Sequence, residues 1–147
     1  MFSKRLTILL AMLLILSLAS GLASAAKAAK EPPLSPVEQD ANLANSIAKI
    51  LGFSVDSDKV TALREKHYSY GDIAMVYSIS HISRKASWDI LAMRDSKMGW
   101  GQIAKQLGVS VGQGLNGVEK IMKEMRMPEE TEKLKDVISK EPKAGKK

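Results

Sequence analysis

The feature that most constrains the fold of this 147-residue chain is an internal repeat with a spacing of thirty residues. Residues 57–80 align with residues 87–110 without a gap, and seven of the aligned pairs are identical. These pairs lie along the whole alignment: Ser57/Ser87, Ala62/Ala92, Arg64/Arg94, Gly71/Gly101, Ile73/Ile103, Ala74/Ala104 and Ser80/Ser110. Chance gives only about one or two identities over such a stretch, so we interpret the match as a duplication.

Each copy has the pattern of a helical hairpin. Ser57 and Ser87 are predicted to cap a helix of about ten residues, which is followed by a break. An aromatic-glycine pair then opens a second helix, and these pairs are Tyr70-Gly71 and Trp100-Gly101. Residues 47–55 also match residues 103–111, which predicts a further half copy at the start of the domain. The sequence therefore predicts an all-α fold, a small bundle of short helices built on a duplicated helix-turn-helix hairpin.

Helical patterns continue on both sides of the repeat. Before it, Ser-Pro-Val-Glu at residues 35–38 is a capping box, and it opens a helix that should end at Gly52. After it, the glycine-rich residues 112–117 predict a loosened segment, followed by an apolar helical face that ends at Pro128. Residues 129–139 are mostly charged and predict a marginal final helix. No stretch alternates between apolar and polar residues as a half-buried strand would.

The N-terminus predicts export. Lys4 and Arg5 precede an apolar run at residues 6–18, and Ala-Ser-Ala at residues 23–25 has the small side chains that a signal peptidase accepts. We therefore expect residues 1–25 to be a cleaved signal peptide. The protein would then work in the periplasm or as a secreted protein, and it would contact the membrane only before cleavage. An uncleaved anchor is the alternative, because residues 6–26 are just long enough to span a bilayer if the weakly apolar alanine, serine and glycine residues are counted.

The rest of the chain divides into three parts. Residues 26–34 are rich in alanine, lysine and proline and predict a flexible leader, residues 35–139 form the helical domain, and residues 140–147 form a basic disordered tail. Removal of the signal peptide lowers the formal net charge from +6 to +4, and lysines alternate with acids except in the tail. A nucleic-acid partner is therefore not expected. The absence of cysteine excludes disulfides, a thiol nucleophile and thiolate metal sites.

Three aromatic residues are the candidates for a binding site. Tyr70, Trp88 and Trp100 have rings that could stack on sugars, which would make a glycan the ligand. The structural alternative is that aromatic residues at helix starts pack across the turn as part of the core or its rim. Recurrence of aromatic residues at matching repeat positions favours the structural alternative, because a duplicated unit repeats its packing.

The sequence contains no arrangement typical of a metal or catalytic site. His67 and His81 are the only histidines, and no acids at ligand spacing accompany them, so a zinc site is not expected. The methionines Met122, Met125 and Met127 fit adaptable core packing better than a copper site. A nucleophile with its base, a paired carboxylate and a glycine-rich phosphate loop are all missing. We therefore expect no cofactor and no enzymatic activity.

Residues 103–110, Ile-Ala-Lys-Gln-Leu-Gly-Val-Ser, resemble the helix-turn core of DNA-binding helix-turn-helix proteins. The residues that follow, Val-Gly-Gln-Gly, provide no arginine or lysine to reach base edges. Residues 100–111 also resemble the middle of a lysin motif, the βααβ module that binds peptidoglycan and chitin. That resemblance implies strands before and after the segment, whereas residues 90–94 have a helical pattern and a closing strand would pass through Gly112 and Gly114.

The repeated Gly-x-Ile-Ala pattern is preceded by an aromatic residue in both copies, and in the second copy by Leu-Ala-Met-Arg at residues 91–94. In this respect residues 57–111 are similar to small exported helical proteins of bacteria that are uncharacterised. The resemblance implies a fold and an exported location without an activity. The sequence thus predicts a non-catalytic binding or structural protein of the cell envelope or extracellular space. It does not identify the partner, for which a glycan and a protein are the candidates. Glycan binding through a lysin-motif-like segment and DNA binding are the alternatives.

Overall fold

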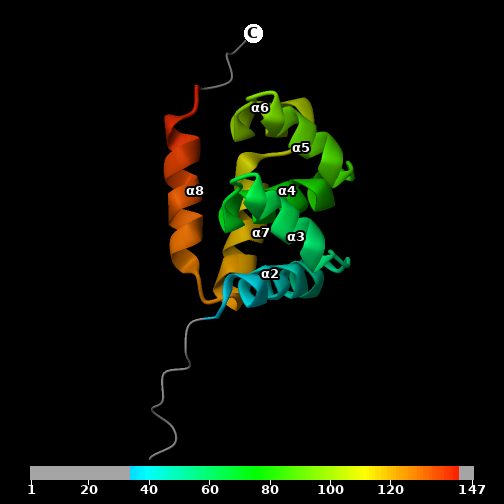
Figure 1. Ribbon diagram of the computed structural model, residues 1–147. Coiled ribbons are helices and arrows are strands. Elements are labelled where there is room, and N and C mark those ends of the chain that lie inside the picture. The colour runs from blue at the N-terminus through cyan, green and yellow to red at the C-terminus, as the bar shows by residue number, and fades with distance from the viewer. Residues whose placement is uncertain (1–33, 143–147) are drawn as a thin grey trace, which may run out of the picture. The chain divides into compact units, whose positions relative to one another are not determined.

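The computed structural model describes residues 34–142, and seven helices account for most of this range (Figure 1). In chain order they are α2 (Pro36–Leu51), α3 (Ser57–Glu65), α4 (Tyr70–Ser83), α5 (Ser87–Asp95), α6 (Trp100–Gln106), α7 (Val111–Glu124) and α8 (Pro128–Lys140). No strand occurs between residues 34 and 142, so the predicted all-α fold is confirmed. The predicted signal peptide, most of the predicted leader and residues 143–147 of the predicted tail lie outside the described residues.

Local capping sets the starts of α2 and α4 where the sequence predicts them. At α2 the Ser35 amide donates to the Glu38 carboxylate at 2.8 Å, and the Ser35 side chain accepts from the Glu38 amide. At α4 the Ser69 hydroxyl accepts from the Asp72 amide at 3.0 Å. Helix α2 ends as predicted at Gly52, whose φ of 78° is readily adopted only by glycine.

The predicted caps of α3 and α5 are wrong by one residue. Asp56 caps α3 because its carboxylate accepts the Asp58 amide at 3.0 Å, and Ser57 is the first helical residue. Ala86 occupies the same position before α5 and has no side-chain acceptor, so Ser87 is again inside the helix. Both helices otherwise span the predicted part of the repeat.

The glycine-rich residues after Ser110 form a regular helix and not the predicted loosened segment. Ser110 and Gln113 make a capping box with two bonds of 3.1 Å, and α7 then runs unbroken to Glu124. Two of its glycines face α4: a Cβ at Gly117 would lie 2.5 Å from the Ser78 hydroxyl oxygen, and one at Gly114 would lie 2.8 Å from Met75 Cε. The close packing against α4 therefore compensates for the low helix propensity of glycine.

Helices α4 and α7 pack against each other in the centre of the domain, and the remaining helices surround them (Figure 1). Nearly every residue of α4 from Tyr70 to Ile79 is buried, so this helix has no solvent face over that length. Helix α2 packs on α3, α4 and α7, while α8 runs along α4 and α7. One apolar cluster contains buried residues from all seven described helices.

Corresponding turns of the two repeats have the same backbone bonds. The Tyr68 amide donates to the Leu63 carbonyl and the Met98 amide to the Met93 carbonyl, each at 3.1 Å. Between these residues, His67 and Lys97 have positive φ angles of 67° and 65°. Helices α3 and α5 also begin thirty residues apart, as do α4 and α6. The duplication itself stays a prediction, and the two copies share this local geometry.

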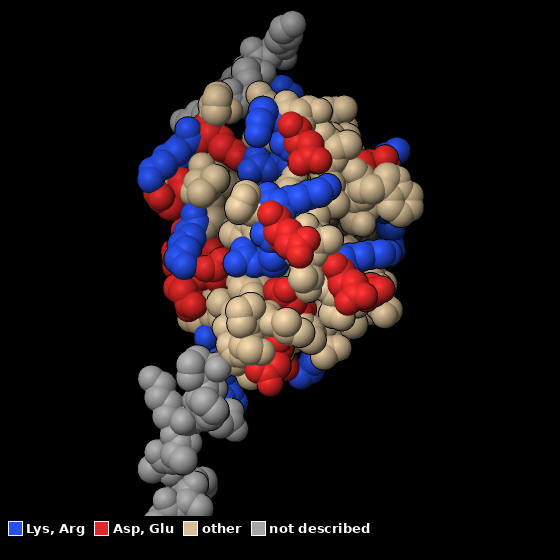
Figure 2. Space-filling model, viewed as in Figure 1, with Lys and Arg blue, Asp and Glu red and all other residues tan. Residues whose placement is uncertain are grey.

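Charges are balanced over the described residues. Residues 34–142 contain fifteen lysines and arginines and fifteen aspartates and glutamates, so the net positive charge belongs to the two ends of the chain. Figure 2 shows basic and acidic side chains interspersed over the face in view. No helix within residues 34–142 is long and apolar enough to cross a membrane.

Candidate binding site

Tyr70 is part of the core and not an open stacking platform. The residue is 6% exposed, and the Arg64 guanidinium carbon lies 4.2 Å from the ring centroid. The Tyr70 hydroxyl donates to the buried carboxylate of Asp40 at 3.0 Å. Burial and this hydrogen bond raise the pKa of Tyr70. The ring therefore anchors the start of α4 against α2.

Trp100 occupies the equivalent place in the second repeat and is fully buried. Arg94 lies over its ring at 4.5 Å, and the indole N–H donates to Asp72 at 3.3 Å. A sugar cannot reach either Tyr70 or Trp100 in this arrangement. The burial of both rings leaves no open aromatic face for a sugar and agrees with the alternative of core packing.

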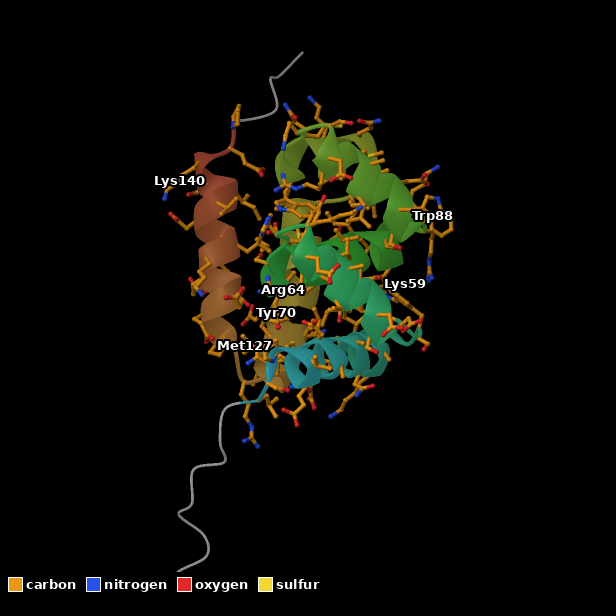
Figure 3. All side chains as sticks on the ribbon, in the orientation of Figure 1. Lys59, Arg64, Tyr70, Trp88, Met127 and Lys140 are labelled. Atoms are coloured by element: carbon orange, nitrogen blue, oxygen red, sulfur yellow. The ribbon has the colours of Figure 1, made fainter. Side chains whose placement is uncertain are left out.

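Trp88 differs from the other two aromatic candidates. It lies in the first turn of α5 and is 72% exposed, and Figure 3 shows it projecting from the edge of the domain. The residue thirty positions earlier is Asp58, so Trp88 does not belong to the aromatic pattern that recurs in the two copies. An indole exposed to this degree gains little from folding, which leaves its hydrophobic surface available for a ligand or partner.

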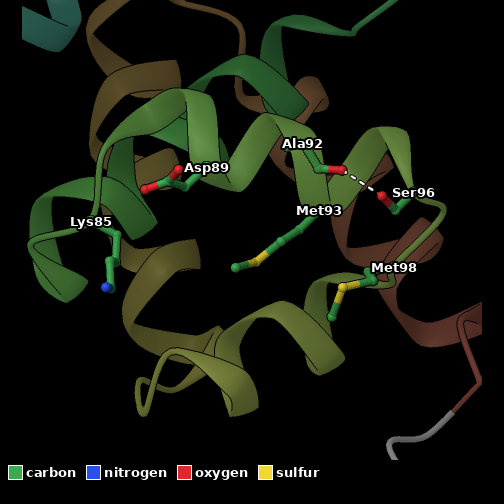
Figure 4. Close-up of a pocket in the computed structure, with 6 residues that line it drawn as sticks. All are labelled: Lys85, Asp89, Ala92, Met93, Ser96 and Met98. Atoms are coloured by element: carbon green, nitrogen blue, oxygen red, sulfur yellow. Dashed lines mark hydrogen bonds between the residues drawn. The ribbon is translucent and has the colours of Figure 1, made fainter.

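A hollow of about 380 Å³ lies beside α5 (Figure 4). In Figure 4 the Met93 side chain extends from α5 across the middle of the hollow, with Lys85 and Asp89 at one end and Met98 at the other. Trp88 is not among the residues that line the hollow, but it directly precedes Asp89 and lies one helical turn before Ala92, both of which do. We call Trp88 and the lining residues the Trp88 surface: Lys85, Asp89, Ala92, Met93, Ser96 and Met98.

The polar groups of the Trp88 surface are available for hydrogen bonds. The Lys85 and Asp89 side chains form no ion pair or hydrogen bond with any residue of the described range 34–142. The Ser96 hydroxyl donates to the Ala92 carbonyl at 2.9 Å, so its oxygen can still accept. Apolar lining with a few unpaired polar groups is typical of ligand sites.

A second hollow, of about 390 Å³, continues the surface on the other side of Lys85. Phe53 and His81 line it, and their rings are stacked with centroids 6.2 Å apart. Arg84 and Lys85 supply positive charge there. Lys85, in the turn between α4 and α5, is the residue that the linings of the two hollows share.

A third hollow, of about 320 Å³, lies between the equivalent turns of the two repeats, but its acidic groups already have partners. Asp95 accepts the Tyr68 hydroxyl at 2.6 Å, and Asp72 accepts the indole of Trp100. Burial, together with the hydrogen bond to Asp95, raises the pKa of Tyr68 to about 12. These contacts join the two repeats, so we assign this polar cluster to the fold.

The metal-ligating residue types are dispersed. Between residues 34 and 142, no three histidine, aspartate or glutamate side chains gather into a set that could hold a metal ion. Met122 and Met125 are buried in the core, and Met127 packs against it. The methionines thus occupy the packing positions that their spacing favours.

The segment that resembles helix-turn-helix proteins and lysin motifs forms α6 and the start of α7. Helix α5 precedes it and helix α7 follows it, at the places where a lysin motif has strands. The exposed side of α7 includes Gln113, Asn116, Glu119 and Lys120. These four side chains carry one negative and one positive charge, so they have no net charge.

Comparison with known protein families, with curated proteins and with solved structures finds no match to this chain. The geometry of the site must therefore carry the functional argument. Sequence reasoning selected Trp88 but missed its neighbours Lys85, Asp89, Met93 and Met98. The mismatch of Trp88 with Asp58 was the available signal, since it marks a residue that the repeated packing does not use.

Proposed function

We propose that this chain is an exported, non-catalytic binding protein that holds its partner on the Trp88 surface, in the periplasm or outside the cell. The observation that carries the proposal is the exposed indole of Trp88 beside a hollow with unpaired polar groups. Tryptophan is among the residues that contribute most to binding interfaces. The other tryptophan, Trp100, is fully buried, so it offers no surface for binding.

A binding role without catalysis is supported by the residue types around the hollow. Asp89 is its only acid, and no histidine or second carboxylate lines it. Acid-base catalysis needs a group positioned to give or take a proton, and commonly a second group that orients it. Lys85 and Asp89 are suited to recognition, because each offers hydrogen bonds of one kind, donor or acceptor.

Export rests on residues 1–25, and their cleavage has a direct test. Mass spectrometry of the native protein should find a mature N-terminus at Ala26, recovered from the periplasm or the medium. Recovery of the full chain from the cytoplasm would contradict the proposal and would return the DNA-binding alternative to consideration. DNA binding further predicts a steep loss of affinity with salt.

The partner-binding role is tested by cross-linking the protein in intact cells and fractionating them. We expect cross-linked complexes with the wild-type chain, and their loss in Trp88→Ala. Lys59→Ala is the matched control, because Lys59 is exposed on α3 at the position equivalent to Asp89. Complexes that persist unchanged in Trp88→Ala would show that the Trp88 surface is not the binding site.

A further inference from the structure

We infer that the ligand of the Trp88 surface is a glycan containing N-acetylhexosamine units, with one sugar ring on the Trp88 indole and its hydroxyl and acetamido groups on the adjoining hollow. The inference rests on the proposed function and names the class of its ligand. It moves the glycan from Tyr70 and Trp100, which are buried, to the aromatic residue that is exposed.

The indole provides the stacking surface. A pyranose ring has an apolar face of C–H groups, and an exposed aromatic ring is the protein surface that this face covers best. Trp88 is 72% exposed at the start of a helix, and the helix fixes the position of its Cα. Covering the indole with a ligand costs the protein little conformational entropy, because a tryptophan side chain has only two torsions.

The unpaired polar groups favour a neutral polyhydroxyl ligand. Lys85 is a donor without an acceptor, and Asp89 is an acceptor without a donor, among the residues between 34 and 142. An anionic ligand would face the Asp89 carboxylate and a cationic ligand would face the Lys85 ammonium. Sugar hydroxyls both donate and accept, so they can satisfy both side chains together. The Ser96 hydroxyl oxygen adds a further acceptor.

The apolar side chains that line the hollow offer a contact for the methyl group of an acetamido substituent. Ala92, Met93 and Met98 line it, and methionine side chains adapt their shape to an apolar group. A methyl group of an N-acetyl substituent can pack there while its amide meets the polar rim. The hollow, of about 380 Å³, is shallow and open to solvent.

The test uses the N-acetylglucosamine tetramer and the full mature chain. We expect a saturable shift of tryptophan emission to shorter wavelength, because the sugar removes Trp88 from water while Trp100 is already buried. Trp88→Ala should abolish the shift and lower the affinity at least tenfold, as measured by calorimetry. Asp89→Ala should lower it several-fold, and Lys59→Ala should leave it unchanged.

Two solid ligands separate the natural sources of this chemistry. Co-sedimentation with purified cell-wall sacculi and with chitin beads is measured for the wild type and for Trp88→Ala. Trp88-dependent binding to either ligand supports the inference. Circular dichroism and thermal unfolding of Trp88→Ala should match the wild type, because the removed side chain is exposed. Trp88→Phe keeps an aromatic ring and should therefore retain part of the affinity for the glycan.

The inference is overturned if the tetramer produces no saturable change at millimolar concentration and neither solid ligand binds the wild type. Equal binding by Trp88→Ala would also overturn it. If cross-linking in cells still depends on Trp88, the partner is a protein, and the proposed function stands without the glycan. If neither glycan binding nor cross-linking depends on Trp88, the Trp88 surface is not a binding site.

Discussion

At the scale of single residues, two arginines explain much of the match between the repeats. Arg64 lies over Tyr70 and Arg94 lies over Trp100, at 4.2 and 4.5 Å from the ring centroids. Each guanidinium also donates to the backbone carbonyl four residues later, at Tyr68 and at Met98. A cation over an aromatic face adds to hydrophobic packing. These contacts within the fold therefore explain why both copies have arginine at this position, and no ligand is needed to explain it.

Tyr68 makes the stability of the protein sensitive to alkaline pH. Burial and the hydrogen bond to Asp95 raise its pKa to about 12 in the folded state, whereas a tyrosine in the unfolded chain ionises near pH 10. The folded state holds the proton more tightly, so this contribution to stability is complete below about pH 10 and is lost as the pH rises to about 12. We expect the melting temperature to fall across that window in circular dichroism experiments.

Tyr68→Phe removes the ionisable group and should make the fall in melting temperature at alkaline pH smaller. It should not remove all of it, because burial also raises the pKa of Tyr70 and of Tyr77. An identical pH dependence in the variant and the wild type would show that Tyr68 ionises in the folded state as freely as in the unfolded chain.

At the scale of helices, α6 is capped by a residue from the far end of the chain. Gly99 has no side chain to cap α6, and the Glu141 carboxylate accepts the Trp100 amide at 2.6 Å and Arg94 at 3.0 Å. A Cβ at Gly99 would lie 2.7 Å from a Glu141 carboxylate oxygen. Glu141 therefore gives α6 a side-chain acceptor for the amide of its first residue, and it holds the end of α8 to α6; in the first repeat Ser69 accepts the amide of the third residue of α4, Asp72.

We expect Glu141→Ala to lower the free energy of unfolding by about 1–2 kcal/mol, because a helix N-terminal amide and a partly buried arginine lose their acceptor. Urea unfolding measures the change. Glu132→Ala is the control on the same helix, since Glu132 is 72% exposed and pairs only with Lys135. Its loss should cost less than about 1 kcal/mol. Equal effects of the two substitutions would contradict the capping role of Glu141.

The α4–α7 contact provides a second prediction for helices. Gly117→Ala should lower the free energy of unfolding by about 1–3 kcal/mol, because the new methyl group would overlap Ser78 on α4. Gly112→Ala is the matched control on the same helix, with only the Ser110 hydroxyl at 3.9 Å from the added Cβ. That substitution should raise stability by up to about 1 kcal/mol through helix propensity. A gain at both positions would mean that helix propensity and not packing against α4 sets the effect.

At the scale of the whole molecule, the two repeats do not form separate units. Ile73 and Ile79 of the first copy and Ile103 of the second share one apolar cluster with Val118 and Ile121 of α7, which lies outside the repeat. The repeat thus provides four of the seven described helices, while α2, α7 and α8 cover what it leaves exposed. Folding should consequently be cooperative over the whole domain.

We therefore expect a peptide of residues 57–110 to be largely unfolded. Its helices are short and would lose the partners that bury their apolar side chains, and isolated helices of this length are marginal in water. Circular dichroism should show little helix and no cooperative thermal transition, whereas residues 34–142 should unfold in a single transition. A cooperative transition in the short peptide would show that the duplicated hairpin is an independent unit.

Features that depend on near neighbours in the chain can be predicted from the sequence alone. The capping box at Ser35, the start of α4 at Tyr70, the end of α2 at Gly52 and the all-α fold follow from bonds and patterns within a few residues. Its errors at Ser57 and Ser87 are shifts of one residue, because a serine next to a capping position has the same local pattern.

Only the tertiary structure decided which side chains meet. Glycines 114 and 117 have low helix propensity, yet they lie in a regular helix. The reason is that α7 packs so closely on α4 that a side chain at either position would overlap Met75 or Ser78. Tyr70, Trp88 and Trp100 look alike as aromatic residues near helix starts, and remote segments bury two of them and leave Trp88 in solvent. The physical reason is that hydrogen bonds within a helix are local in sequence, whereas burial depends on all the helices that pack around a residue.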